Sequence, residues 1–319
     1  MVFDSRVNHC TIVVEVACRF KRCGDLINKS DSTCRILDNL QEYRGNVDQK
    51  SPQNMLHSRK TVEPHRLENT KLLLVTGQGR SGTTVLTKAV AEHPEIYSNR
   101  VESNVMKDVL LAGQASSTMP SRIKQMVLPR VQHDLVFRRM LLSLLFPFND
   151  DDKEPTAIST FSAMNPAAAE FAIAVFPGIH FANIVRNGIE VVASRMMHRV
   201  FQAHPFENQC LAWAASLEMA KWGADREDFS LIRHESLLNH EACVTTFENL
   251  FQKVGLQPSS SVAEYVSQTQ KNQTVLPEED NPTLENRSER WNHWTAEQKR
   301  MFVELCGEAM DYFGYQVPS

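Results

Sequence analysis

The sequence has no apolar run long enough to cross a bilayer, and it carries no large excess of charge of either sign. A membrane-spanning helix needs about 20 consecutive, mostly apolar residues, and no segment of the 319-residue chain reaches that length. The formal net charge is −4, and no long block of lysine and arginine occurs. Because proteins that bind nucleic acid present a basic face, we predict a protein that binds neither membrane nor nucleic acid.

Paired cysteines and a secretory leader are also missing. The seven cysteines are an odd number, and none of their spacings is the C-x-x-C pair typical of zinc sites. Residues 1–10 lack the charged segment and apolar core of a signal peptide. These absences predict free thiols, no metal site and a cytoplasmic location.

The remaining composition is typical of a folded protein. Hydrophobic residues make up 42% of the chain and charged residues 23%, which are ordinary values for a globular domain. Residues 1–68 show no clear periodicity, so we predict an N-terminal extension that is poorly ordered. Residues 69–319 are predicted to form one large α/β domain.

Alternating strand and helix patterns run through this domain. Short apolar segments predict strands at 72–75, 96–98, 155–161, 180–185 and 228–233. Residues 206–224 are predicted to form a single helix with four core positions at helical spacing. These positions are Leu211, Ala215, Met219 and Trp222.

Residues 71–88 are the most informative stretch, because they read as a buried strand, a glycine-rich turn and the start of a helix. The glycines that allow a sharp turn close to a ligand are Gly77, Gly79 and Gly82. The helix starts among three hydroxyl residues, Ser81, Thr83 and Thr84. A helix start offers unpaired amides and the positive end of a dipole, so this turn is predicted to bind an anion.

The turn differs at one position from the nucleotide-binding loop G-x-x-x-x-G-K-[ST]. Gly77, Gly82 and Thr84 fit that pattern, but Thr83 stands in the lysine position and the nearest cation is Arg80. A kinase or NTPase needs the lysine for the terminal phosphates of ATP. The sequence therefore favours a phosphate ester whose terminal group leaves without a metal. The alternative is an ordinary strand–turn–helix corner.

Two motifs, taken together, resemble those of the sulfotransferase family. Residues 79–84, followed by His93-Pro94-Glu95, resemble the family's 5′-phosphosulfate loop, and residues 181–195 resemble its 3′-phosphate motif. The similarity covers roughly residues 69–315 and is nearer to the bacterial and tyrosylprotein sulfotransferases than to the cytosolic aryl kind. It implies a three-layer α/β/α fold with a central parallel sheet and P-loop topology.

The resemblance also implies a donor, 3′-phosphoadenosine 5′-phosphosulfate (PAPS), which is released as PAP. The loop residues implied to bind it are Gly79, Arg80, Ser81, Gly82, Thr83 and Thr84. Arg186 follows a predicted strand and Ser194 lies eight residues later, so the pair is expected to clamp the 3′-phosphate. Asn187-Gly188 replaces the family's usual Asp-Pro, and either pair can stand at the start of a helix. The alternative is that Arg186 is an ordinary surface ion-pair residue.

Glu102 is the predicted general base. It follows the strand at 96–98, on the side where α/β sheets place ligands. In the tyrosylprotein and bacterial sulfotransferases, a glutamate in this region acts as the base. The alternative is that Glu102 caps a helix beginning near Ser103. Many relatives also carry a lysine at the end of the third strand, but none occurs here between Lys153 and Lys221, so Arg80 is the expected cation at the transferred group.

The C-terminal part contributes a further expectation by resemblance. Relatives close a basic loop over the nucleotide before the last helix, and Arg287 is the residue here that would reach the 3′-phosphate. The last helix is expected to be capped by Thr295, with Gln298 three residues later. Glu235, in a segment similar to another family pattern, is expected to be structural.

Together these observations predict a PAPS-dependent sulfotransferase that acts on a hydroxyl or amine, without a metal. Because the chain has no strong positive charge and no membrane anchor, a small metabolite is the favoured acceptor and a protein or carbohydrate the alternative. An ATP-dependent phosphotransferase and a non-catalytic nucleotide-binding protein remain as other classes. A homodimer is compatible with the sequence.

Overall fold

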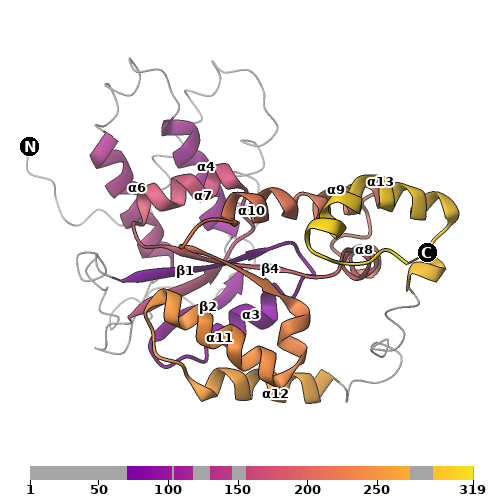
Figure 1. The fold of residues 1–319 in the computed structure, drawn as a ribbon. Helices are drawn as coiled ribbons and strands as arrows, with labels where there is room; N and C mark the ends of the chain where they lie inside the picture. The colour runs from indigo at the N-terminus through magenta and orange to yellow at the C-terminus, as the bar shows by residue number, and fades with distance from the viewer. Residues whose placement is uncertain (1–69, 103, 118–129, 146–155, 274–289, 319) are drawn as a thin grey trace, which may run out of the picture. The chain divides into compact units, whose positions relative to one another are not determined.

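The computed structural model describes residues 70–102, 104–117, 130–145, 156–273 and 290–318 (Figure 1). The predicted extension at residues 1–68 and the predicted nucleotide contact Arg287 lie outside these residues.

A five-stranded sheet, parallel at every pairing, lies at the centre of the described fold. The strands are β1 (Lys71–Gly77), β2 (Ile96–Glu102), β3 (Ala157–Phe161), β4 (His180–Val185) and β5 (Phe229–Arg233). Their order across the sheet is β2-β3-β1-β4-β5. The strands β2 and β3 therefore lie on one side of β1, and β4 and β5 lie on the other. Sheets of this class bind ligands at the carboxyl ends of the strands, where the strand order reverses. That point is the end of β1.

The inner strands β3 and β4 are buried along their whole length because both faces of the sheet are covered. All six residues of β4 and all five of β3 are buried, as expected for strands between two helical layers. β5, at the edge, instead has an exposed Leu231 and a buried Phe229 and Ile232. The predicted strands are therefore confirmed, and β2 extends further than predicted, to Glu102.

Helices cover both faces of the sheet (Figure 1). One face packs on α3 (Thr83–Val90), α11 (His240–Val254) and α12 (Ser260–Gln273). The other packs on α4 (Asn104–Ser117), α6 (Arg130–Leu145), α7 (Pro166–Val175) and α10 (Ser216–Gly223). This is the predicted three-layer α/β/α fold.

A third group of helices packs beyond the carboxyl end of β4 (Figure 1). It consists of α8 (Gly188–Met197), α9 (Phe206–Ala214) and α13 (Ala296–Tyr312), which share a core around Trp213 and Phe302. The predicted cap of α13 is confirmed, because Thr295 and Gln298 form a reciprocal capping box. This group places the N-terminus of α8 next to the end of the sheet.

The prediction of one helix over residues 206–224 is wrong in detail. The structure has two helices, α9 and α10, separated at Ala215, and the expected core residue Leu211 is 47% exposed. The two halves bury different faces, since Trp213 packs with α8 and α13 whereas Met219 packs against the sheet. One continuous helix, with a single apolar stripe, could not bury residues against both of these neighbours.

Candidate functional site

The turn between β1 and α3 leaves the start of that helix without a side-chain cap. Gly82 is the N-cap residue, and its carbonyl accepts the first helical hydrogen bond from the Leu86 amide at 3.0 Å. The Ser81 amide closes the turn by donating to the Gln78 carbonyl at 3.0 Å. No side chain caps the first amides of α3, so these amides are available to an anion, and anion binding at this helix start stays a prediction.

The hydroxyl residues of the turn differ in their exposure. The side chains of Ser81 and Thr83 are buried, whereas Thr84 is exposed. Thr83, which replaces the lysine of the ATP-binding loop, therefore faces the protein interior. Only the Thr84 hydroxyl is open to solvent among these three.

The backbone of the turn takes conformations that favour glycine. Gly82 has φ 99°, and a Cβ there would lie 2.4 Å from Cδ2 of His234. A Cβ on Gly77 would lie 2.5 Å from the carbonyl oxygen of Ile184. Arg80 has φ 78° and is the one non-glycine residue with positive φ in the described part of the chain. Such a conformation costs about 1–3 kcal/mol and persists only where its surroundings impose it.

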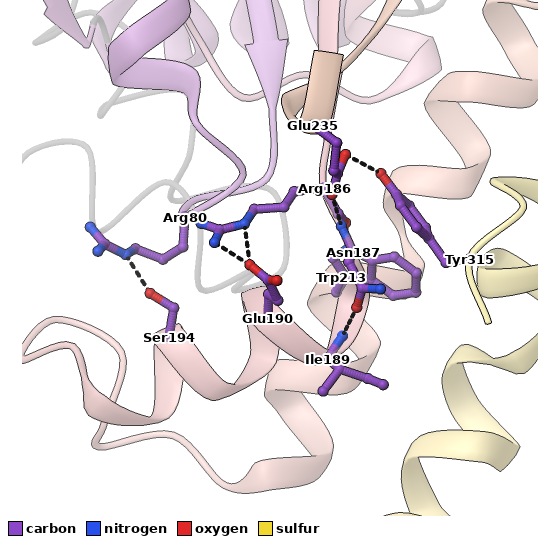
Figure 2. A network of polar contacts seen from close by, with 9 residues as sticks. All are labelled: Arg80, Arg186, Asn187, Ile189, Glu190, Ser194, Trp213, Glu235 and Tyr315. Atoms are coloured by element: carbon purple, nitrogen blue, oxygen red, sulfur yellow. Dashed lines mark hydrogen bonds and ion pairs between the residues drawn. The ribbon is translucent and has the colours of Figure 1, made fainter. Parts of the chain in front are cut away.

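Two guanidinium groups and a hydroxyl meet beside the turn (Figure 2). The Nε of Arg80 donates to the Oγ of Ser194 at 3.0 Å. Partial burial, and then the positive charge of Arg186, lower the pKa of Arg80. The structure thus brings together three residues that the sequence analysis assigned to the nucleotide. Neighbouring cations repel each other, so an anion bound between them would stabilise the arrangement.

Arg186 lies at the junction of β4 and α8 and is largely buried. Its side chain is 12% exposed, and its Nε donates to Oε2 of Glu190 at 3.0 Å, one helical turn later. The Nε1 of Trp213 donates to the Arg186 carbonyl at 3.1 Å. The ion pair considered as the alternative role of Arg186 is therefore present, but in a buried turn rather than at an open surface.

Asn187 and Gly188 form the start of α8. The Oδ1 of Asn187 caps the helix by accepting from the Ile189 amide at 3.0 Å. A Cβ on Gly188 would lie 2.8 Å from the ring of Trp213. The glycine therefore lets the indole approach close enough to bond the carbonyl of Arg186.

Glu235 supports the same turn from the end of β5. Its Oε1 accepts from the Asn187 amide at 3.0 Å, and its Oε2 accepts from the Tyr315 hydroxyl at 2.8 Å (Figure 2). Burial, and then the negative charge of Glu235, raise the pKa of Tyr315. Sequence reasoning expected a structural role for Glu235 but did not single out Tyr315 or Trp213. The position of Tyr315 after the last helix carries no pattern that could have identified it.

Comparison with known families assigns the chain. Residues 73–257, more than half of the sequence, match the model of the sulfotransferase family. The chain belongs to the sulfotransferase family. A search of curated protein sequences found no significant match.

Solved sulfotransferase structures resemble this sulfotransferase at low sequence identity. The sulfotransferase domain of the olefin synthase from Synechococcus PCC 7002 has a TM-score of 0.51 and 14% identity, over 78% of this chain and 96% of that one. The sulfotransferase domain of the curacin biosynthetic pathway has a TM-score of 0.46 and 14% identity, over 82% and 100%. A mouse sulfotransferase solved with PAP has a TM-score of 0.44 and 12% identity, over 76% and 85%. The first of these likenesses supports the fold.

The predicted base of this sulfotransferase lies at the expected edge of the sheet. Glu102 is the last residue of β2, and its backbone pairs in register with Phe161 at the end of β3. The pairing is irregular between Ser98 and Glu102. β3 separates β2 from β1, so Glu102 lies two strands away from the turn between β1 and α3, at the same end of the sheet. Its role as base stays a prediction.

Among the described residues of this sulfotransferase, no three His, Cys, Asp or Glu side chains gather as they would around a metal ion. No described helix combines the length and apolar character that crossing a membrane requires.

Proposed function

We propose that this sulfotransferase transfers a sulfuryl group from PAPS to a hydroxyl or amine of a small metabolite, releasing PAP. The observation that carries the proposal is the convergence of Arg80, Arg186 and Ser194 beside the uncapped start of α3. A nucleotide with phosphates at both its 5′ and 3′ positions is a ligand that matches two cations and a helix start together.

We assign the 5′-phosphosulfate of the nucleotide to the turn between β1 and α3. The amides of Gly82, Thr83 and Thr84 and the guanidinium of Arg80 would stabilise the charge that develops on the leaving phosphate. Arg80 uses its Nε for Ser194, and a guanidinium has five N–H donors, so its terminal nitrogens can serve the anion. The Ser81 amide is used within the turn itself.

The 3′ side is assigned to Arg186 and Ser194. The Ser194 oxygen accepts from Arg80, and a hydroxyl can accept and donate at once, so its hydrogen is available to a phosphate oxygen. Arg186 would exchange its contact with Glu190 for the phosphate. Arg287 is proposed as a further contact.

The chemical step exchanges one bond to sulfur for another. The bond from sulfur to the 5′-phosphate oxygen breaks, a bond from sulfur to the acceptor oxygen or nitrogen forms, and Glu102 takes the acceptor's proton. The anhydride already contains the free energy of transfer, so alignment and charge stabilisation are the protein's contributions. The buried Thr83 in the lysine position argues against ATP as the donor.

Two measurements test the proposal. PAP should raise the thermal unfolding temperature, and magnesium–ATP at the same concentration should raise it less. With 35S-labelled PAPS, label should pass to small hydroxyl or amine compounds in a screen that also contains peptides and oligosaccharides. Stronger stabilisation by magnesium–ATP would contradict PAPS as the donor. Label appearing only in peptides or oligosaccharides would contradict the small acceptor.

A further inference from the structure

Arg195 is a buried cation next to the phosphate turn. Only 8% of its surface is exposed. Its Nε donates to Oε1 of Gln209 at 2.6 Å, and its Nη1 donates to the carbonyl of Gly79 at 3.5 Å. Burial lowers the pKa of Arg195. In the described part of the chain no carboxylate forms an ion pair with it, so its charge is held by neutral oxygens.

An aromatic ring packs against both this guanidinium and the turn. The guanidinium carbon of Arg195 lies 4.2 Å from the ring centroid of Phe201. A Cβ on Gly79 would lie 2.9 Å from Cζ of the same ring. The Nε2 of Gln209 donates to the Phe201 carbonyl at 2.7 Å. We call Arg195, Phe201 and Gln209 the loop brace, because each contacts another and two of them contact Gly79.

The loop brace acts at the strained part of the turn. Gly79 directly precedes Arg80, whose φ of 78° must be imposed by its surroundings. The bond from Arg80 to Ser194 is at the surface, where water competes with it. Arg195 is buried, and its bond to the Gly79 carbonyl is partly buried. The brace therefore adds a constraint on this conformation that is less exposed to water.

Fixing the Gly79 carbonyl also fixes an amide. The C=O and the following N–H of a trans peptide point in opposite directions across one plane. The bond from Arg195 to the Gly79 carbonyl therefore sets the direction of the Arg80 N–H. Residues with left-handed backbone in such a turn orient successive amides into a concave anion site.

We infer that Arg195 is a positioning residue that holds the turn in its anion-binding conformation and so sets affinity for the 5′ end of the nucleotide. This inference rests on the proposed function. Arg195 acts through the peptide after Gly79, without contacting the nucleotide. In the 3′ clamp, Arg186 is held instead by contacts with Glu190 and Trp213, which do not involve Arg195. Loss of Arg195 should therefore weaken one end of the ligand selectively.

The test is calorimetry with three ligands: PAP, adenosine 5′-phosphate and adenosine 3′-phosphate. Arg195→Met should lower affinity for PAP and for the 5′-phosphate about tenfold, as expected for one contact of a charged group. Affinity for the 3′-phosphate should change less than about twofold, a difference of under 0.5 kcal/mol. The matched control is Arg199→Met, which removes an exposed arginine four residues later and should leave all three affinities unchanged.

Arg195→Lys gives a second variant, which keeps the charge and the long stem. A single ammonium lacks the planar fork that bonds Gln209 and Gly79 in two directions, so the same selective loss is expected even if Arg195→Met fails to fold. The inference would be overturned if a folded variant kept its affinity for adenosine 5′-phosphate, or if it lost affinity equally for the 5′- and 3′-phosphates. The proposed function would survive either result as long as the wild-type protein binds PAP. If wild-type protein does not bind PAP, both fail.

Discussion

Arg80 and Ser194, 114 residues apart in the sequence, are joined by a hydrogen bond of 3.0 Å. This bond connects the turn after β1 to the helix after β4, and so links the two motifs that resemble those of the family. A guanidinium assigned to the 5′ end of the nucleotide thus orients a hydroxyl assigned to its 3′ end. Four predictions concern this site and the sheet behind it.

The first concerns Arg80. Arg80→Ala and Arg80→Gly both remove the guanidinium, so both should lower turnover far more than they lower the free energy of unfolding. Because φ is 78° at this position, the glycine variant should be about 1 kcal/mol more stable than the alanine variant. A coupled PAP-release assay and urea unfolding measure the two effects. Near-normal turnover of either variant would contradict the assignment.

The second concerns Arg186 and its ion-pair partner. Arg186→Ala should weaken PAP binding by about 1.5–3 kcal/mol, the range for a hydrogen bond to a charged group. Glu190→Gln removes a negative charge next to the expected phosphate while leaving the arginine, so it should strengthen PAP binding. Calorimetry gives both values, with the exposed Arg300→Ala as control. If the affinity for PAP changed in the same direction in Arg186→Ala and Glu190→Gln, the assignment of a phosphate to Arg186 would be contradicted.

The third concerns Tyr315. Tyr315→Phe removes the bond from its hydroxyl to Glu235, so it should cost about 1 kcal/mol of stability and weaken PAP binding through the turn at Asn187. Because the pKa of Tyr315 is raised above its usual value of 10.0, the neutral hydroxyl favours the folded state. Its contribution is complete below pH 10 and is lost as the pH rises above it. Urea unfolding at pH 8 and at high pH should show a gap between wild type and variant that narrows as the pH rises. A constant gap would contradict the raised pKa of Tyr315, and the absence of a gap at pH 8 would show that the hydroxyl bond contributes nothing.

The fourth concerns His180, buried in β4. Its Nε2 contacts the Ser230 hydroxyl at 2.9 Å. Burial, and then the charge of Lys253, lower its pKa from 6.5 to about 4, against the opposing effect of Asp228. Between pH 6.5 and about 4, His180 is protonated in the unfolded chain but neutral in the folded protein. The free energy of unfolding therefore falls as the pH drops through this interval.

His180→Gln keeps a polar group at this position but cannot titrate. Its stability should therefore fall less over the same interval, by a difference of up to about 3 kcal/mol. Thermal unfolding across pH 4–7 measures this, and the exposed His204→Gln should behave like wild type. Parallel curves for His180→Gln and wild type would show that His180 does not set the acid response.

The sequence was sufficient for the features whose signals are local. The strand, the glycines and the helix start of residues 71–88 lie within one stretch, and each has its own chemical reason in the structure. Gly82 is an example, since both its φ and its closeness to His234 require a glycine. The junction at Arg186 was predicted in the same way, from a strand end followed by a helix.

Features that depend on distant partners could not be predicted. Arg195 meets Gly79 across 116 residues and Tyr315 meets Glu235 across 80, and no spacing in the sequence records either contact. Among the core positions predicted in residues 206–224, Met219 is buried but Leu211 is exposed, for a related reason. The stripe that a helix buries depends on which neighbours it meets. Trp213 of α9 packs with α8 and α13, whereas α10 packs both there, through Leu217, and on the sheet, through Met219.

The carboxylate of Glu190 has a consequence for which solutes the site retains. One of its oxygens already bonds the guanidinium of Arg186. Any anion that binds this guanidinium must therefore compete with the single negative charge of Glu190. A dianionic phosphoryl group has the charge to win that exchange, whereas chloride or a simple carboxylic acid has little advantage. We therefore expect Arg186 to select the proposed phosphate by its charge before its shape.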